Sequence, residues 1–186
     1  QLWKRVNQRF FTYKMEKRIA FRRLFKKGRI VITRKGSFVL KLAKKVVFWI
    51  SPYSKRIEIV GSIRRKEKNP VDIDIVLIPK NKEKIEHILE KKGRKILGGD
   101  KKAYFKVQGV EVELYYTLPK EWGAALLAYS SRVGSGIGLR VVARTKGFKL
   151  TQHGLFNRKT GKRVAGRTEE QIYHALGRPW KKPEER

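Results

Sequence analysis

Two carboxylates in the middle of the chain have the spacing of a metal site. Asp72 and Asp74 alternate with Val71, Ile73 and Ile75, the period-two pattern of a strand with one buried face. Alternate residues of a strand project from the same face, about 7 Å apart at the Cα atoms. Two like charges placed side by side are unfavourable unless a cation lies between them. We therefore expect a divalent cation here, Mg²⁺ or Mn²⁺, because both prefer hard oxygen ligands.

Another pair of carboxylates lies on a later strand-like segment. In the run V-E-V-E-L of residues 110–114, Glu111 and Glu113 share one face and the apolar residues share the other. Either one can supply a third carboxylate to the site. Two cations held by three carboxylates activate a primer 3′-hydroxyl and stabilise the departing pyrophosphate. The acidic residues thus predict nucleotidyl transfer.

A phosphate-binding segment precedes the first carboxylate pair. Gly61 and Ser62 end an expected strand and offer backbone N–H groups and a hydroxyl. Arg64 and Arg65 follow, and their guanidinium groups match phosphate oxygens in geometry and charge. Together with the carboxylates, this segment predicts a site for a nucleoside triphosphate and its metal ions.

The elements that must position these residues follow from hydrophobic periodicity and from helix and turn signals. In the first half we expect a helix over 38–50, strands at 56–60 and 71–78, a helix over 81–92 stopped by Gly93, and a hairpin of strands at 102–107 and 110–117. In the second half we expect a helix at 122–128, a glycine-rich break at 134–138, a helix ending at Gly147, strands at 148–150 and 154–156, and a helix from Thr168 to Gly177. The pattern is that of an α+β protein.

The charge of the chain points to a polyanionic partner. Its 186 residues include 47 Lys and Arg against 16 Asp and Glu, for a net charge of +31. Residues 1–36 hold 13 of the basic residues and a single acid, interleaved with aromatic residues. Such a mixture suits phosphate contacts and base stacking, although a solvated arm whose aromatic residues dock on the rest of the protein is an equally good interpretation. We expect nucleic acid as the partner.

Composition also excludes several classes of protein. The chain has no Cys and only three scattered His, which excludes disulfide scaffolds and thiolate zinc sites. No apolar run approaches the roughly 20 residues of a membrane span, and the apolar residues are not gathered on one amphipathic face. We expect a soluble intracellular protein that does not bind membranes and is a monomer. A start at Gln1 is typical of a fragment of a longer chain.

The same residues resemble a known family. The run I-E-I-V-G-S-I-R-R-(x)6-D-I-D-I-V-L-I at 57–78 resembles the nucleotidyltransferase palm of the family X (beta-type) DNA polymerases. The runs L-R-(x)5-K-G-F-K-L-(x)3-G-L-F at 139–156 and G-R-T-E-E-Q-I-Y-(x)2-L-G at 166–177, with the tail at 183–186, resemble that family's thumb and C-terminus. The resemblance covers roughly residues 38–186. It implies a reduced palm-plus-thumb form, as in small viral members.

The resemblance implies a domain organisation and a role for each site residue. The domains would be a basic N-terminal arm at 1–36, a palm of mixed or antiparallel strands with flanking helices at 37–118, and a mainly helical thumb with a short hairpin at 119–186. Asp72 and Asp74 would bind two Mg²⁺ ions, with Mn²⁺ as a substitute, and Glu113 would be the third carboxylate. The triphosphate and sugar of a dNTP would contact Gly61, Ser62, Arg64, Arg65 and Tyr129. DNA would contact Arg140 in the thumb and Lys4, Arg5, Arg22, Arg23, Lys26 and Lys27 in the arm.

The sequence departs from the family pattern at two places. The third carboxylate is normally Asp, so Glu113 must accommodate an extra methylene, and Glu111 remains an alternative for this role. The aromatic pair expected beneath the nucleotide sugar is reduced to Ala128-Tyr129. A smaller residue there weakens the exclusion of a ribose 2′-hydroxyl.

We expect a template-directed DNA polymerase that extends a primer 3′ end and fills short gaps. A template-independent terminal transferase or an RNA-tailing enzyme would use the same catalytic residues. A transferase acting on a small molecule or protein would not need the high positive charge. A non-catalytic nucleic-acid-binding module on this fold would tolerate the altered third carboxylate.

Overall fold

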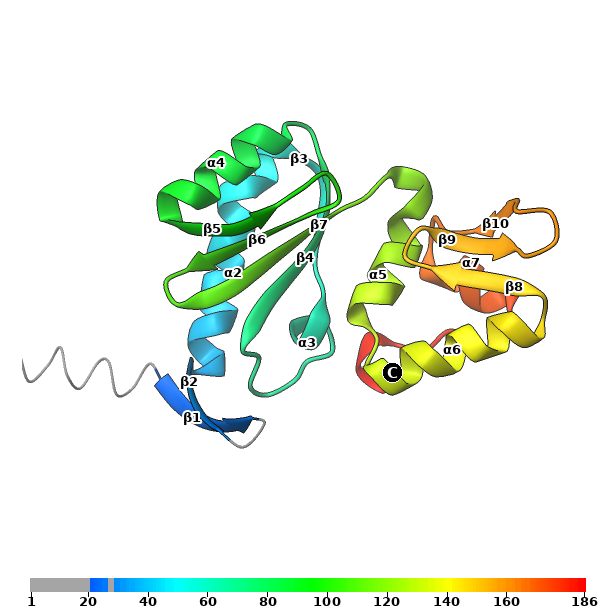
Figure 1. Ribbon diagram of the computed structural model, residues 1–186, viewed down its shortest axis with the longest axis horizontal. Coiled ribbons are helices and arrows are strands. Elements are labelled where there is room, and N and C mark those ends of the chain that lie inside the picture. The colour runs from blue at the N-terminus through cyan, green and yellow to red at the C-terminus, as the bar shows by residue number, and fades with distance from the viewer. Residues whose placement is uncertain (1–20, 27–28) are drawn as a thin grey trace, which may run out of the picture.

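The chain forms two α+β parts joined by one helix (Figure 1). The computed structural model describes residues 21–26 and 29–186. A five-stranded sheet with its helices makes up the first part, which we call the palm, and a mainly helical second part from Pro119 onward is called the thumb. The expected α+β fold class is confirmed.

The palm sheet is mixed. Its strand order is β3-β4-β7-β6-β5, with β4 and β7 parallel and every other pair antiparallel. The strands are β3 Ser54–Ile59, β4 Asp72–Pro79, β5 Gly93–Gly98, β6 Lys102–Val107 and β7 Val110–Tyr116. A two-residue turn joins β6 to β7, and both of its residues have positive φ, Gln108 at 50° and Gly109 at 81°. The parallel pair at the centre brings segments about 40 residues apart into direct contact.

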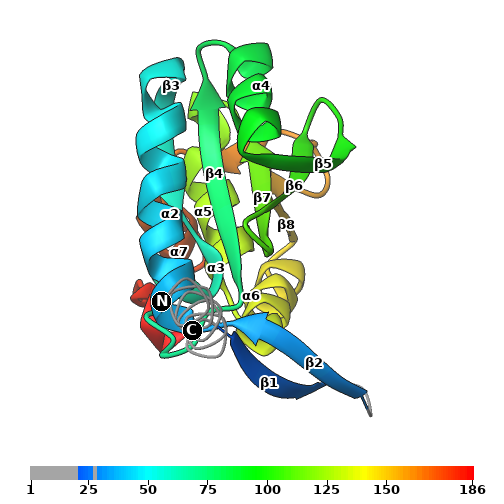
Figure 2. The ribbon, with the colours of Figure 1, turned by 90° about the vertical axis from the view of Figure 1, so that its left-hand side faces the viewer.

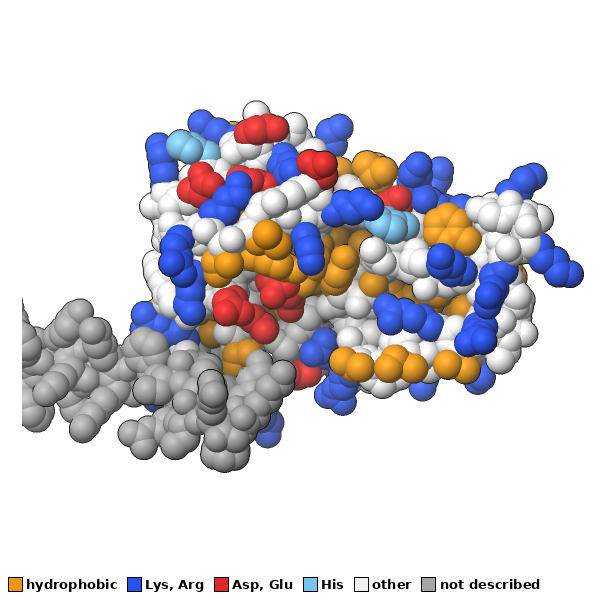
Figure 3. Space-filling model, viewed as in Figure 1, with side chains coloured by type: hydrophobic (Ala, Val, Ile, Leu, Met, Phe, Trp, Pro, Cys, Tyr) orange, Lys and Arg blue, Asp and Glu red, His pale blue; other side chains and the backbone are white. Residues whose placement is uncertain are grey.

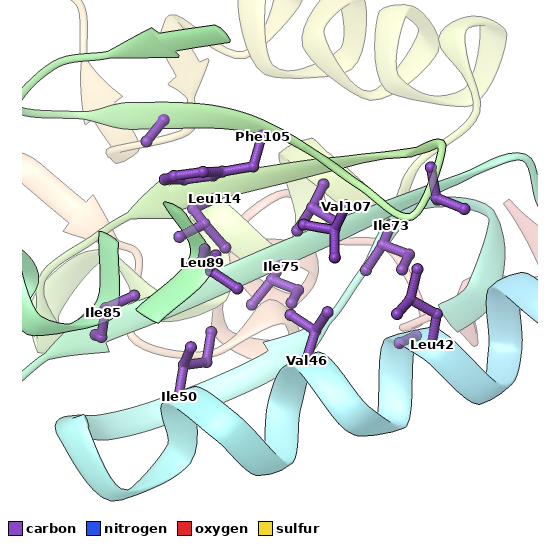
Figure 4. Packing of buried hydrophobic residues seen from close by; sticks show 14 of the residues in the cluster. Leu42, Val46, Ile50, Ile73, Ile75, Ile85, Leu89, Phe105, Val107 and Leu114 are labelled. Carbon is purple, nitrogen blue, oxygen red and sulfur yellow. The ribbon is translucent and has the colours of Figure 1, made fainter. Parts of the chain in front are cut away.

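Two helices cover one face of this sheet. Helix α2, Gly36–Ile50, and helix α4, Lys82–Lys92, pack their apolar sides against the alternate inward residues of β4, β6 and β7 (Figures 2 and 4). Leu42, Val46 and Ile50 are at most 2% exposed and contact this core from α2. The short 3₁₀ helix η1, Ser51–Tyr53, then turns the chain into β3. One face of β4, β6 and β7 is therefore committed to the core, which leaves their other face for the polar residues.

The opposite face of the sheet is only partly covered. Helix α5, Trp122–Ser130, packs Trp122, Ala125 and Leu126 against Val76 and Ile78 near the C-terminal end of β4. The same helix contributes Ala124 and Leu127 to the thumb core. The N-terminal half of β4, which carries the paired aspartates, lies beyond this apolar contact.

The thumb packs helices around a small antiparallel sheet of order β10-β9-β8. Its elements are η2 Pro119–Glu121, α5, α6 Val133–Thr145, β8 Phe148–Thr151, β9 Gly154–Asn157, β10 Arg163–Ala165, α7 Glu169–Ala175 and η3 Pro183–Glu185. The hydroxyl of Thr168 accepts a hydrogen bond from the backbone N–H of Gln171 and caps α7. Gly177, at φ +61°, follows α7 and provides its expected stop.

Part of the basic arm forms a hairpin. Strands β1, Phe21–Lys26, and β2, Arg29–Arg34, pair antiparallel and project from the end of the palm where α2 begins (Figure 2). Arg34 Nε donates to the carbonyl of Gln108 at 3.0 Å, which ties the end of β2 to the β6–β7 turn. The expected DNA contacts Lys4, Arg5 and Lys27 lie outside the described residues, and so do the side chains of Arg22, Arg23 and Lys26.

The secondary structure differs from the expected elements at several places. The glycines at 134, 136 and 138 do not break the chain but lie inside α6. Nothing lies within 4 Å of a Cβ built at Gly134 or Gly138, so these glycines only lower helix propensity on an exposed face. Strands β5 and β10 were not expected, since β5 is exposed throughout and β10 has only three residues.

No helix in the described part of the chain is long and apolar enough to cross a membrane.

Two glycine-to-alanine substitutions test the packing of the thumb. A Cβ at Gly123 in α5 would lie 2.1 Å from the backbone carbon of Thr168, so Gly123→Ala must push α5 away from the start of α7. We expect it to lower the free energy of unfolding by about 2 kcal/mol or more. Gly138→Ala, the matched control on the open face of α6, should raise it by about 0.4–1 kcal/mol. Urea denaturation measures both, and equal effects would contradict the close contact between α5 and α7.

Candidate active site

The parallel pairing of β4 and β7 gathers the expected carboxylates. In the register of the two strands, Asp72 lies beside Glu111 and Asp74 beside Glu113. Their neighbours in sequence, such as Ile73, point into the palm core, so all four carboxylates lie on the opposite face. Acidic side chains gather near the middle of the molecule in the space-filling view, amid many Lys and Arg side chains (Figure 3). The register thus places Glu113 beside Asp74 and Glu111 farther along the strand, beside Asp72.

This crowding changes the acidity of Asp74. Burial raises the pKa of its carboxyl group to about 7, and the negative charges of Asp72 and Glu113 add to the shift. A hydrogen bond from Tyr115 and the charge of Arg65 act in the opposite direction. Near neutral pH the site therefore holds more negative charge than its surroundings compensate.

Tyr115 connects the third carboxylate to the first pair. Its hydroxyl donates to Oε2 of Glu113 and lies 3.4 Å from Oδ1 of Asp74. Its ring stacks on the ring of Tyr129 from α5, with 3.7 Å between the centroids and 17° between the planes. Tyr129, expected to contact the nucleotide sugar, therefore lies against the ring whose hydroxyl contacts the carboxylates.

The segment expected to bind phosphate passes directly over Asp74. Gly61 begins the short helix α3, Gly61–Arg64, with φ +63°, and a Cβ there would lie 1.9 Å from Oδ2 of Asp74. Only glycine fits this position, for both conformation and space. The hydroxyl of Ser62 is buried and has no hydrogen-bond partner among the described residues. A buried polar atom of this kind is typical of a position that a ligand completes.

The two arginines after Ser62 have different surroundings. Arg65 donates from Nε to Glu67 and from Nη1 to the backbone carbonyl of Ser130, and its positive charge acts on Asp74. Arg64 instead directs its guanidinium into the thumb, where it makes two hydrogen bonds of 2.8 and 2.9 Å to Glu169. Arg65 thus lies at the carboxylates, whereas Arg64 joins the palm to the thumb.

Glu169 is the centre of this contact. It is 4% exposed and also accepts a hydrogen bond from Nη1 of Arg186 at 2.8 Å. Burial opposes ionisation, yet the hydrogen bonds from Arg64 and Arg186 hold the pKa of Glu169 below its usual range. Lys66 adds a more exposed ion pair with Glu184 at 2.7 Å. Ion pairs therefore fix the phosphate-binding segment to the C-terminal part of the thumb.

The remaining predicted site residue among those described belongs to the thumb. Arg140 lies on α6 with its side chain exposed. Apolar residues Val133, Ile137 and Val141 recur every four positions along the same helix and are 53–81% exposed. The helix therefore offers a mixed basic and apolar surface to the solvent.

The donor set suits a hard divalent cation. Carboxylates on the adjacent strands β4 and β7 offer oxygen ligands, and a cation between them would relieve the repulsion that adds to the raised pKa of Asp74. Among residues 34–186 no group of three or more Asp, Glu or His side chains is already gathered as a metal cage. The residues that would hold a cation are Asp72, Asp74 and Glu113, which the strand register places on one face.

Sequence reasoning missed two features of the site. Tyr115 was not singled out, although its position two residues after Glu113 on one strand places both side chains on the same face. Glu169 was interpreted as a first-turn acid of a helix, which it is, but its contact with Arg64 spans 105 residues. No local pattern signals a contact of that length.

Comparison with known proteins agrees with this geometry. The family model of the DNA polymerase beta thumb matches residues 136–186. The repair DNA polymerase X of African swine fever virus isolate Warthog/Namibia/Wart80/1980 is 30% identical over 143 residues, which cover 72% of this chain and 82% of the relative. The protein of the same name from isolate Pig/Kenya/KEN-50/1950 is 29% identical over 143 residues, with the same coverage.

A palm with carboxylates on one sheet face, followed by a thumb of the polymerase beta type, defines a nucleotidyltransferase of the polymerase class. The chain belongs to the family X DNA polymerases and is similar to their small viral members. It is a DNA-directed DNA polymerase of that family.

The raised pKa of Asp74 predicts how stability depends on pH. This pKa lies near 7 in the folded chain and near 3.8 in the unfolded chain. At pH values between these two pKa values, folding is therefore accompanied by the uptake of a proton. The metal-free protein should therefore lose stability as the pH rises from about 4 through 7. Asp74→Asn removes the charge and should raise the Tm at pH 8 by about 2–4 °C or more.

Thermal unfolding in EDTA at pH 4 and pH 8 measures this effect. At pH 4 the variant and the unaltered protein should differ little. Asp100→Asn is the matched control, because Asp100 is a fully exposed palm aspartate that faces only Lys82. An equal Tm for Asp74→Asn and the unaltered protein at pH 8 would contradict the raised pKa of Asp74.

Proposed function

We propose that this polymerase adds nucleotides to a DNA primer 3′ end by metal-dependent transfer directed by a template, and that it fills short gaps during repair. The observation that carries the proposal is the register that places Asp74 beside Glu113 and Asp72 beside Glu111, under the Gly61-Ser62 segment. Relatives named repair DNA polymerase X support the repair role.

Each residue at the site has a proposed part in holding the incoming nucleotide. The unpartnered hydroxyl of Ser62 and the guanidinium of Arg65 would contact the triphosphate, close to the carboxylates. Because Gly61 has no Cβ, the backbone passes close to Asp74, which would let the triphosphate approach the carboxylates. Tyr129 would lie beneath the sugar, with its ring position fixed by the stack on Tyr115. The triphosphate and sugar sites are thereby built on different domains.

The carboxylates would supply the ligands for the chemistry. Two Mg²⁺ ions, when bound by Asp72, Asp74 and Glu113, lower the pKa of the primer hydroxyl and stabilise the charge on the pyrophosphate. Burial and the negative charges of Asp72 and Glu113 raise the pKa of Asp74 to about 7, so a bound cation would favour its ionised form. Mn²⁺ has the same preference for oxygen ligands and is a suitable substitute.

DNA binding would rest mainly on charge. The net charge of +31 favours phosphate contacts that release counterions, and binding should weaken steeply with salt. The exposed Arg140 on α6 would contact the template strand. We propose that the basic hairpin β1–β2 and the residues before it hold the duplex from the palm side.

A primer-extension assay tests this function. With Mg²⁺ and a one-nucleotide gap, we expect addition of the nucleotide complementary to the template when each dNTP is offered singly. Asp74→Asn should lower the rate at least about 100-fold, because the site loses a ligand charge without loss of stability. Asp100→Asn, which removes the same charge from an exposed loop, should retain full activity.

The outcomes separate the rival functions. Addition that ignores the template base would indicate a terminal transferase or a tailing enzyme. DNA binding without addition would indicate a non-catalytic module on this fold, and absence of both would indicate a small-molecule or protein substrate.

A second prediction concerns the sugar. The family resemblance places two aromatic residues beneath the sugar, and this chain has Ala128 and Tyr129 there. Ala128 leaves room for a 2′-hydroxyl, so we expect appreciable incorporation of ribonucleotides. Parallel single-nucleotide extensions with dATP and ATP measure the ratio, and Ala128→Tyr should shift it toward dATP by about 10-fold or more. A thousandfold preference for dATP in the unaltered enzyme would refute the prediction.

A further inference from the structure

We propose that Tyr115 is a positioning residue, which holds the carboxylate of Glu113 against Asp74 and so sets the affinity of the site for divalent cations. The proposal rests on the proposed function in one respect, that Asp72, Asp74 and Glu113 are the ligands of the cation. It adds Tyr115 as the residue that lets a glutamate, Glu113, serve as the third carboxylate.

The geometry at Tyr115 suits this role. Glu113 and Tyr115 are two residues apart on β7 and share the face of the sheet that carries Asp74. The hydroxyl of Tyr115 donates to Oε2 of Glu113 and also contacts Oδ1 of Asp74 at 3.4 Å. A single hydroxyl therefore bridges the third carboxylate to the first pair.

The length of the Glu113 side chain explains the need for such a contact. Glutamate has one methylene and one rotatable bond more than aspartate, so its carboxylate samples more positions, and fixing it costs conformational entropy. A hydrogen bond that already orients the carboxylate removes part of that cost. Hydrogen bonds from an outer residue to a ligating carboxylate commonly change metal affinity by about 10- to 100-fold.

The hydroxyl of Tyr115 is itself held in place. Its ring is half-buried and stacks on Tyr129 of α5, with centroids 3.7 Å apart. A tyrosine side chain has few rotatable bonds, and a stacked ring loses most of its remaining freedom. Through Tyr115, the ring of Tyr129 on α5 thereby helps to fix the orientation of Glu113 at the junction with the thumb.

An opposite role for Tyr115 is chemically conceivable, in which its hydroxyl competes with a cation for the carboxylates. The bonding pattern favours positioning, because the short hydrogen bond reaches only Oε2 of Glu113. The second oxygen of that carboxylate is left for a cation. The two roles predict opposite changes in affinity when the hydroxyl is removed.

Binding of Mn²⁺, measured by electron paramagnetic resonance without DNA or nucleotide, tests the proposal. Tyr115→Phe keeps the ring and its stack but removes the hydroxyl, and should raise the Kd for Mn²⁺ about 10-fold with an unchanged circular dichroism spectrum. The matched control is Tyr116→Phe, because the hydroxyl of Tyr116 also donates to a glutamate, Glu86, at 2.8 Å. That variant should bind Mn²⁺ like the unaltered protein.

A double-mutant cycle shows whether Tyr115 acts through Glu113. In Glu113→Asp the shorter side chain no longer reaches the hydroxyl, so adding Tyr115→Phe should change the Kd less than about 3-fold. An equal effect of Tyr115→Phe in both backgrounds would overturn the proposal, and so would unchanged or tighter Mn²⁺ binding by the single variant.

The measurement also separates this proposal from the proposed function. Mn²⁺ binding that is lost in Asp74→Asn but unaffected by Tyr115→Phe would overturn only the role of Tyr115. Absence of Mn²⁺ binding in the unaltered protein, or binding retained in Asp74→Asn, would overturn the metal site and the role of Tyr115 together.

Discussion

The repulsion among carboxylates on adjacent parallel strands is the constraint around which this structure is arranged. Asp72 and Asp74 on β4 are paired with Glu111 and Glu113 on β7, and burial with this crowding raises the pKa of Asp74 to about 7. Folding alone gains nothing from such an arrangement, because each added like charge opposes ionisation of the others. The core on the opposite face compensates, since Ile73, Ile75 and their neighbours fix both strands regardless of what their polar faces carry. An otherwise basic chain thus keeps a concentrated acidic site.

The palm and thumb are joined where the nucleotide would bind. Glu169 accepts hydrogen bonds from Arg64 of the palm and Arg186 of the thumb, and it is almost fully buried. Removing one partner of a buried ion pair leaves an uncompensated charge and commonly costs about 3–5 kcal/mol. Because Arg64 lies next to Arg65 and two residues after Ser62, a movement of the thumb would be transmitted directly to the phosphate-binding segment.

Helix α5 has a comparable connecting role. Trp122, Ala125 and Leu126 pack on the palm sheet, while Ala124 and Leu127 belong to the thumb core. Its Tyr129 stacks on Tyr115, and the backbone carbonyl of Ser130 accepts a hydrogen bond from Arg65. One helix therefore contacts both an aromatic ring and an arginine of the palm at the candidate site.

The sequence by itself indicated most elements of the palm and the polymerase class of the protein. Alternation in D-I-D-I-V-L-I and V-E-V-E-L specified two strands with acidic faces, and helix signals located α2, α4 and α7. These features are readable because strand and helix periods are local properties of the chain. Local signals failed for the glycines at 134–138, whose low helix propensity did not prevent α6 from forming.

Only the tertiary structure decided which of these residues meet. The parallel register of β4 and β7 selects Glu113 over Glu111 as the neighbour of Asp74. It also places Tyr115 at the carboxylates, and the packing of the thumb on the palm directs Arg64 to Glu169. Contacts between residues 40 to 105 positions apart depend on how whole elements pack against one another, and no spacing within a single segment encodes that.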